Sequence, residues 1–337
     1  MKFGSVSLSE AEGTVLAHAV TLPGGRLKKG HLLAAQDVAA LAGAGLAEVI
    51  VARLEPGDVA ENAAAVRLAR ALVPDPQAAG LKLDAPFTGR VNIRATGPGV
   101  IALEADAIAA LNAVDPMITL ATVPPWQRVV DGMMVGTVKM ISYAVGEAAL
   151  GQACEAGRGA LRRLPPVMRH VDLIVTEIAG APARADDKGI GSVWARVERL
   201  GLMRGALRIV PHEAGAVADA LAASHGDLAL ILTGSATSDI ADVAPTAIVG
   251  AGGEVIRFGM PVDPGNLLVL GRIGARPVIG LPGCARSPAL NGADWVLERI
   301  ACGVAVTGRD IAAMGVGGLL KEIPTRPQPR EGRGAAR

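Results

Sequence analysis

Aromatic side chains are scarce in this sequence, and their shortage sets the first limits on what the chain does. Only three Trp, one Tyr and three Phe occur among 337 residues, although half of the residues are hydrophobic. The cores must therefore be packed from Ala, Val, Leu and Ile, and the shortage of rings argues against nucleic-acid binding by aromatic stacking. A chain of this length is long enough for two or three domains, each with its own core.

Cysteine, clustered histidine and net charge are also lacking. The three Cys are too scattered for a disulfide framework or a zinc site, and the five His show no ligand spacing, so a reducing cytoplasm is the expected location. The 33 basic and 32 acidic residues give a formal charge of +1, which provides no general attraction to nucleic acid or to an anionic membrane. An anionic ligand must therefore be held by a local site.

Long apolar runs are missing as well. The chain begins Met1-Lys-Phe-Gly-Ser-Val without an apolar signal core, and apolar windows elsewhere are interrupted by charge or Gly before they reach about 18 residues. No membrane association is expected. Residues 324–337 combine Pro, Gly and Arg without apolar anchors, which predicts a disordered tail or a linker.

Two segments with different patterns precede the carboxyl half. Residues 1–76 predict a small mixed α/β domain that ends at the double proline Pro74-Asp-Pro76. Residues 85–145 consist of short apolar runs broken by Gly and Pro, which predicts a β-rich module. The expected elements are helices at 37–44, 59–72 and 106–112, a strand at 48–52 and a hairpin at 129–139.

Residues 168–322 show a regular alternation of strand and helix patterns. Such alternation predicts an α/β domain of three layers, with a parallel sheet covered by helices on both faces. The expected strands lie at 171–176, 206–210, 228–232, 267–270 and 277–280, and the expected helices at 192–200, 213–224 and 287–301.

An apolar run followed by small hydroxyl residues is the most informative feature of this half. Leu228 to Leu232 has the length and apolarity of a strand buried on both faces, and its carboxyl end is where open α/β sheets bind ligands. Short side chains there let backbone N–H groups approach a phosphate, and the next helix adds its N-terminal partial charge. Asp242 either caps that helix or ligates a metal, and an ordinary strand-to-helix turn remains the alternative. The candidate loop consists of Thr233, Gly234, Ser235, Ala236, Thr237 and Ser238.

The segment from Leu232 to Ala247 resembles the molybdopterin-binding domain shared by molybdopterin adenylyltransferases and molybdopterin molybdenumtransferases. The adenylyltransferase pattern runs Thr-Thr-Gly-Gly-Thr-Gly, four variable residues, then Asp-Val-Thr-Pro-Glu-Ala. Ser235 and Thr237 replace the second and third glycines of the loop. The ungapped match keeps Thr233, Gly234, Asp242, Val243, Pro245 and Ala247.

Upstream and downstream motifs extend the resemblance. Asp187-Lys188-Gly-Ile is similar to the stretch after the first strand of that domain. His212 occupies the place of an acid in the adenylyltransferases, and the favoured alternative is that it only stands at the start of a helix. Lys188 pairs with a phosphate in this interpretation, and a solvated loop Lys is the alternative. Pro264-Gly265-Asn266 resembles a Pro-Gly-Lys-Pro loop of the molybdenumtransferases, with Asn in place of Lys.

Two further segments are similar to the molybdenumtransferases. Pro282-Gly283-Cys284 resembles a Leu-Pro-Gly-Asn-Pro turn before a helix, with Cys in place of Asn. The Cys284 thiol is either a molybdenum ligand or a small buried hydrophobe. The first 50 residues more loosely resemble the opening segment of the same family.

The resemblance implies a cytoplasmic protein of molybdenum cofactor biosynthesis that binds molybdopterin or its nucleotide form and assists molybdate insertion or nucleotide transfer. Asp187 and Asp242 would be the catalytic acids and would position Mg²⁺ or molybdate, which neutralises charge in phosphoanhydride chemistry. The pterin would lie against Pro264-Gly265 and Pro282-Gly283. A homo-oligomer and a separate molybdenum-cofactor nucleotidyltransferase as partner are left open.

The alternative is a carrier or regulatory module without turnover, which His212 and Asn266 both favour. A nicotinamide dehydrogenase has little support because no Gly-x-Gly-x-x-Gly follows a strand. The sequence also lacks the Gly-x-x-x-x-Gly-Lys-Ser/Thr pattern of P-loop enzymes.

Overall fold

A computed structural model describes residues 1–180 and 182–320 of the chain. The tail predicted at 324–337 lies outside the described residues. The chain divides into two compact units: unit 1 contains residues 1–97 and 101–164, and unit 2 contains residues 98–100 and those from 165 onward.

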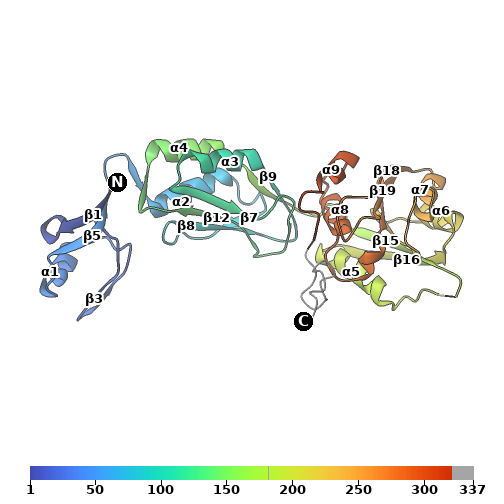
Figure 1. The fold of residues 1–337 in the computed structure, drawn as a ribbon, viewed down its shortest axis with the longest axis horizontal. Helices are drawn as coiled ribbons and strands as arrows, with labels where there is room; N and C mark the ends of the chain where they lie inside the picture. The colour runs from blue at the N-terminus through green and yellow to red at the C-terminus, as the bar shows by residue number, and fades with distance from the viewer. Residues whose placement is uncertain (181, 321–337) are drawn as a thin grey trace, which may run out of the picture. The chain divides into compact units, whose positions relative to one another are not determined.

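Unit 2 is built on a six-stranded sheet with the strand order β16-β15-β17-β20-β19-β18 (Figure 1). The strands β16, β15, β17 and β20 run parallel to one another, whereas β19 is antiparallel to both of its neighbours. Their bounds are β15 His170–Glu177, β16 Met203–Pro211, β17 Leu228–Leu232, β18 Glu254–Phe258, β19 Val269–Ile273 and β20 Arg276–Leu281.

Helices cover both faces of this sheet, as the predicted three-layer arrangement requires. Alternate residues of β15 point to opposite faces, so Leu173 packs in one core with α5 (Lys188–Arg199) and α8 (Gly292–Ala301). Ile174 packs in the other core with α6 (Ala214–Ala222) and α7 (Val243–Gly250). The short helix α9 (Gly308–Ala313) adds Ile311 to the first core.

The prediction of a wholly parallel sheet is wrong at one side of unit 2. Strand β18 was not expected, and β19 pairs with it and with β20 in antiparallel fashion. The short turn at Gly274, which has a φ of +59°, joins β19 to β20 as a hairpin, and a hairpin necessarily makes adjacent strands antiparallel. The sheet is therefore mixed.

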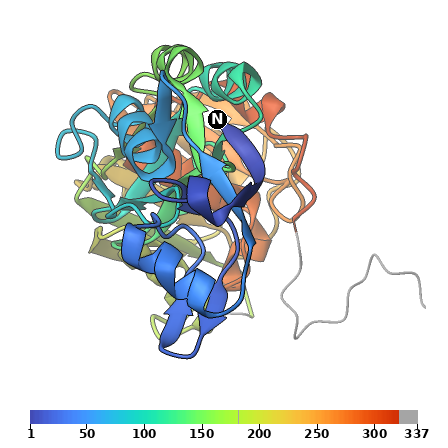
Figure 2. The same ribbon diagram turned by 90° about the vertical axis from the view of Figure 1, so that its left-hand side faces the viewer.

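Unit 1 contains two hydrophobic cores. The first involves residues of 11–51, where α1 (Ala35–Gly43) lies beside the sheet β1-β5-β2 in the blue part of the chain (Figure 2). The strands here are β1 Lys2–Ser7, β2 Val15–Leu16, β3 Val20–Leu22, β4 Gly25–Leu27 and β5 Glu48–Arg53. Strands β3 and β4 form a hairpin of their own.

The second core of unit 1 gathers residues from Ala64 to Leu161. Its sheets have the orders β10-β12-β8-β7 and β11-β9-β14, and a two-stranded sheet pairs β13 with β6. The strands are β6 Asp58–Ala60, β7 Leu81–Leu83, β8 Arg90–Ala95, β9 Gly99–Leu103, β10 Ile118–Thr122, β11 Arg128–Val129, β12 Met134–Met140, β13 Ala144–Gly146 and β14 Leu161–Leu164. The helices are α2 Glu61–Leu72, α3 Ala105–Val114 and α4 Glu147–Ala156.

The structure of unit 1 bears on two of the predictions made from the sequence. The hairpin expected at 129–139 does not form, because β11 and β12 belong to different sheets. Helix α2, expected to close a first domain at residue 76, buries Leu68 and Leu72 in the same core as β8 and β12. The domain division itself stays a prediction. Within residues 1–180 and 182–320, no helix combines the length and apolar character needed to cross a lipid bilayer.

Candidate functional site

The topology of unit 2 places all the predicted site segments at one edge of its sheet. The parallel strands β15, β17 and β20 end at the same edge, so the segments that follow Glu177, Leu232 and Leu281 emerge together. Strand β18 runs in the same direction as β20, because β19 is antiparallel to both. The loop between β18 and β19, which carries Pro264 and Gly265, therefore lies at this edge as well.

The loop after β17 leaves a run of unused backbone donors. The N–H groups of Ser235, Ala236 and Thr237 have no hydrogen-bond acceptor among the described residues. The flanking N–H groups are used within the chain: Gly234 donates to Thr176 Oγ1 at 2.7 Å, and Ser238 donates to Asp242 Oδ2 at 2.9 Å. The flanking bonds fix the loop, and successive free N–H groups are a usual anion-binding arrangement.

Gly234 stands where a side chain cannot be accommodated. A Cβ at this position would lie 2.8 Å from the carbonyl oxygen of Thr176 in β15. The close approach of the two backbones is also what brings the Gly234 N–H group within reach of the Thr176 hydroxyl. Glycine is thus required here by packing between the loop and the neighbouring strand.

Asp242 is the N-cap of α7. Its carboxylate accepts hydrogen bonds from the N–H groups of Val243 at 2.7 Å and of Ser238 at 2.9 Å, and so it ties the helix to the loop. The bond from Ser238 is the main cause that lowers the pKa of Asp242; burial opposes it, and the Val243 bond and the charge of His212 lower the pKa further. The carboxylate is therefore ionised at neutral pH.

Thr176 and His212 form a polar chain beside the loop. Thr176, the last buried residue of β15, is 1% exposed, and its hydroxyl lies 2.8 Å from Nδ1 of His212. The same hydroxyl oxygen accepts the N–H group of Gly234. His212 follows β16 directly, and its backbone N–H group donates to the carbonyl of Glu177. The imidazole and the loop are therefore linked through the same threonine hydroxyl.

Arg286 joins two of the predicted segments. Its guanidinium donates to the carbonyl oxygen of Thr233 at 3.0 Å, and Nη1 lies 3.8 Å from Oδ1 of Asp187. Asp187 is the N-cap of α5 and accepts the N–H group of Gly189 at 2.6 Å. A Cβ at Gly189 would lie 2.9 Å from the Arg286 side chain, so this glycine makes room for the arginine. Lys188 is exposed at the start of α5.

A buried arginine shapes the turn that contains Pro282 and Gly283. Arg196 of α5 is 5% exposed and pairs with Asp294, at 2.5 Å between Nε and Oδ1. Its other guanidinium nitrogens donate to the carbonyl oxygens of Ser192, Ala285, Ser287 and Ala289. Because three of these carbonyls belong to the segment after β20, the path of this segment depends on one side chain.

The loop with Pro264, Gly265 and Asn266 is fixed against the start of α8. The N–H group of Gly292 donates to the carbonyl oxygen of Pro264 at 2.8 Å, and a Cβ at Gly265 would lie 2.6 Å from the Gly292 nitrogen. Asn266 donates from its side chain to the carbonyl of Met260 at 3.4 Å. The Asp263–Pro264 peptide bond is cis.

Cys284 does not have the environment of a reactive thiol. The side chain is half-buried, and burial raises its pKa above the ordinary value of a cysteine. The protonated thiol is favoured there, and it is the poorer metal ligand. Among the described residues, no group of three or more His, Cys, Asp or Glu side chains is arranged to hold a metal ion.

Thr176, Arg286 and Arg196 were not singled out by the sequence as site residues. Thr176 appeared only as the last residue of the strand expected at 171–176. The partners of the three residues lie 36 to 99 residues away in the sequence, apart from Ser192, which is four residues from Arg196. The sequence contains a local indication of a site residue only for Thr176, which is a polar residue at the end of an apolar strand.

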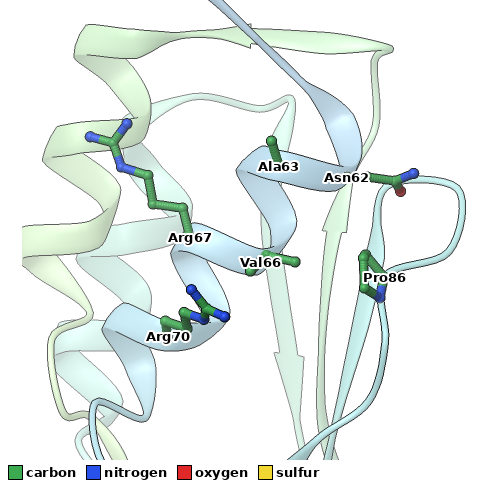
Figure 3. Close-up of a pocket in the computed structure, with 6 residues that line it drawn as sticks. All are labelled: Asn62, Ala63, Val66, Arg67, Arg70 and Pro86. Carbon is green, nitrogen blue, oxygen red and sulfur yellow. The ribbon is translucent and has the colours of Figure 1, made fainter.

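Two hollows lie on unit 1 and contain none of the predicted site residues. One, of about 530 Å³, is lined by Asn62, Ala63, Val66, Arg67, Arg70 and Pro86 along α2 (Figure 3). The other, of about 770 Å³, shares Arg70 with it and extends to β7. In the first hollow Arg67 is paired with Glu147 at 2.6 Å, so part of its positive charge is neutralised.

Comparisons with known proteins find the following. A family described as a domain of unknown function (DUF8806) matches residues 5–53. The comparison with curated proteins finds no match. Similar solved structures include proteins of molybdenum cofactor biosynthesis, the group that the motifs resemble.

Three of these structures are each 14% identical to this chain. The molybdopterin biosynthesis moea protein from Pyrococcus horikosii has a TM-score of 0.32, and the similarity covers 92% of this chain and 76% of that one. A molybdenum cofactor biosynthesis protein B has a TM-score of 0.30, with 41% and 96% covered. A molybdenum cofactor biosynthesis protein from Pyrococcus furiosus has a TM-score of 0.24, with 93% and 65% covered.

Proposed function

We propose that unit 2 binds molybdopterin or its nucleotide form at the carboxyl edge of its sheet, as a protein of molybdenum cofactor biosynthesis. The observation that carries this proposal is the run of N–H groups of Ser235, Ala236 and Thr237 without acceptors. The loop has the length of the corresponding loop in the family that the sequence resembles. The phosphate of the ligand would accept hydrogen bonds from these three N–H groups, while the bonds made by Gly234 and Ser238 within the chain keep the loop in shape.

Charges around the loop suit a phosphorylated ligand. Arg286 is about a third exposed at the loop and Lys188 is exposed nearby, so both can neutralise a phosphate. Asp187 is half-exposed and uses Oδ1 to cap α5, which leaves Oδ2 for a cation. Mg²⁺ usually takes one or two carboxylates together with phosphate oxygens and water, so it does not need the larger cluster of side chains that is missing among the described residues.

Asp187 and Asp242 would hold such a Mg²⁺ ion, which supplies charge neutralisation when phosphate or molybdate oxygens approach each other. Asp242 already accepts two N–H bonds, and each oxygen retains a second lone pair. The pterin would extend from the loop towards Pro264, Gly265 and Asn266, and towards Pro282 and Gly283 of the next turn. Hydrogen bonds and aliphatic contacts would hold it.

A second candidate function is a carrier that binds the cofactor without turnover and delivers it to a separate transferase. The observation that favours it is His212, whose imidazole takes the place of a carboxylate and is held by Thr176. An imidazole in that position offers no anionic oxygen and cannot hold Mg²⁺ as a carboxylate does. Asn266 likewise carries no charge where the molybdenumtransferases have a lysine.

Calorimetric titration of the full chain with molybdopterin tests the binding proposal. We expect saturable binding by the wild type and a loss of at least tenfold for Gly234→Val, because a side chain there separates the loop from β15. Gly215→Ala in α6 is the matched control, since its Cβ meets open space. Equal affinity of wild type and Gly234→Val, with both folded, would show that the loop is not the site.

Incubation with molybdopterin and Mg-ATP distinguishes the enzyme from the carrier. Transfer of AMP, followed by chromatography, is expected to be absent or slow with this chain alone. Rapid formation of the adenylylated product at neutral pH would remove the support that His212 gives to the carrier.

A further inference from the structure

We propose that His212 is a ligand-binding residue of the loop site, held by Thr176 as the Nε2–H tautomer so that Nε2 donates a hydrogen bond to an oxygen of the ligand. This inference rests on the proposed function and assigns one donor within the same site. The class of ligand group that fits is an anionic oxygen of a phosphate. The family that the sequence resembles has a carboxylate at this place, which accepts hydrogen bonds and repels such an oxygen.

The tautomer follows from the hydrogen bonds of the Thr176 hydroxyl. Its oxygen already accepts the Gly234 N–H group at 2.7 Å, and it lies 2.8 Å from Nδ1 of His212. If the hydroxyl proton is donated to Nδ1, both the Thr176 hydroxyl and Nδ1 of His212 are satisfied. If Nδ1 carries the proton, the hydroxyl of a residue that is 1% exposed has no other acceptor among the described residues. Leaving a buried donor unsatisfied is unfavourable, so Nδ1 accepts and Nε2 carries the proton.

The environment of Nε2 fits a donor to a ligand. The His212 side chain is partly exposed, and Nε2 has no partner in the described part of the chain. The carboxylate of Asp242 accepts the N–H group of Ser238 at the end of the same loop. Thr176 contacts both the ring and Gly234. A ligand bound by the N–H groups of Ser235 to Thr237 would therefore meet the imidazole beside them.

A purely positioning role for His212 makes a different prediction. In that case the ring matters only because Nδ1 orients Thr176, which in turn fixes Gly234. Two substitutions separate the roles, because Asn places a polar atom near the position of Nδ1 and Gln places one near the position of Nε2. His212→Asn keeps the bond to Thr176 and removes the donor to the ligand. His212→Gln keeps a donor for the ligand and loses the native bond to Thr176.

The first experiment needs no ligand. Long-range ¹H–¹⁵N NMR of the histidine rings in the full chain reports which nitrogen carries the proton, and loss of one of the five ring patterns in His212→Asn assigns the signals. We expect the Nε2–H pattern at a pH above the ordinary pKa of histidine. An Nδ1–H pattern would overturn the inference.

The second experiment measures the affinity for molybdopterin by calorimetry. We expect His212→Asn to bind about tenfold or more weakly, and His212→Gln to remain within about threefold of the wild type. The reverse order would show a positioning role only and would overturn the inference. If the wild type does not bind molybdopterin, the proposed function fails by itself. Inorganic phosphate is then titrated against the assigned ring signals, and an Nε2 signal that does not respond to phosphate overturns the inference separately.

Discussion

Removing the carboxylate of Asp242 is expected to destabilise unit 2 and to loosen the loop. Asp242→Ala removes the bonds to the N–H groups of Val243 and Ser238. Loss of an N-cap lowers the free energy of unfolding by about 0.5–2 kcal/mol. The second lost hydrogen bond, from the exposed Ser238, contributes less than a buried bond would, so the expected total loss is about 2 kcal/mol. For a unit of this size that corresponds to a Tm decrease of about 4–8 °C.

Asp242→Asn is the matched variant for this prediction. Asn is about as good an N-cap as Asp, but only one of its two side-chain polar atoms accepts a bond, so we expect a loss of about 1 kcal/mol or less. Affinity for molybdopterin, measured without Mg²⁺ so that only the capping role of Asp242 is tested, is expected to fall at least tenfold in Asp242→Ala and to stay within about threefold in Asp242→Asn. Urea unfolding followed by Trp fluorescence in a Trp126→Phe background reports unit 2, because Trp194 and Trp295 both belong to it.

The pH dependence gives an independent check. The folded pKa of Asp242 is lowered, so its contribution to stability is fully present above the ordinary pKa of an aspartate and is lost as the pH falls through the folded value. The difference between wild type and Asp242→Ala should therefore shrink in acid. The capping account is refuted if both variants are as stable as the wild type, or if Asp242→Asn loses affinity as fully as Asp242→Ala while it remains equally folded.

Three further substitutions test how unit 2 is stabilised. Gly234→Ala should lower the free energy of unfolding of unit 2 in urea, because its Cβ would lie 2.8 Å from a backbone oxygen. The control Gly215→Ala, whose Cβ meets open space, should be neutral or stabilising. Equal stability of the two variants would contradict the packing argument. Arg196→Met should lower the free energy of unfolding by about 3–5 kcal/mol in the same assay, because it leaves the buried carboxylate of Asp294 without its charged partner. A loss below about 1 kcal/mol would show that the ion pair is not needed for stability. Asp172 accepts four hydrogen bonds, which outweigh the opposing effect of burial and lower its pKa. Asp172→Asn should therefore be destabilising at neutral pH and nearly neutral once the pH falls below the lowered pKa, and a pH-independent cost would rule out the ionised carboxylate as the cause.

The sequence predicted the central strands of unit 2 because burial alone determines their residue types. All five residues of β17 are buried, so an uninterrupted apolar run marked its bounds at Leu228 and Leu232. Strand β18 was missed because its residues are partly buried or exposed, two of them are charged, and Gly252-Gly253 before it resembles a loop. The sheet was expected to be parallel because the hairpin at Gly274, which makes β19 antiparallel to β20, was not recognised.

The start of α8 shows a different reason for error. A helix was expected from Ser287, but the structure has a 3₁₀ turn at Gly283–Arg286 and begins α8 at Gly292 after the N-cap Asn291. The capping box of Asn291 and Asp294 is visible in the sequence as Asn-x-x-Asp. The buried guanidinium of Arg196, which holds the carbonyls of Ala285, Ser287 and Ala289, is not visible because its partners are about 90 residues away.

The sequence predicted the separate segments of the candidate site, but it did not predict the hydrogen bonds that join them. Small residues in the loop, the cap at Asp242 and the turn at Gly265 each have a local signature. The chain from His212 through Thr176 to Gly234 depends on the register of β15 with its two neighbours, which sets Thr176 opposite Val210 and puts Val175 opposite Leu232. Contacts of this kind follow from tertiary structure and leave no local pattern.

The central claim is that the loop from Gly234 to Ser238 holds a molybdopterin species, and the small molecules carried by the protein test it most directly. The full chain is purified from cells that make the cofactor, and mass spectrometry is applied to what it releases on denaturation, with Gly234→Val purified in parallel. We predict molybdopterin or its nucleotide form from the wild type and much less from the variant. Release of a different phosphorylated compound, or equal amounts of molybdopterin from both proteins, would contradict the claim.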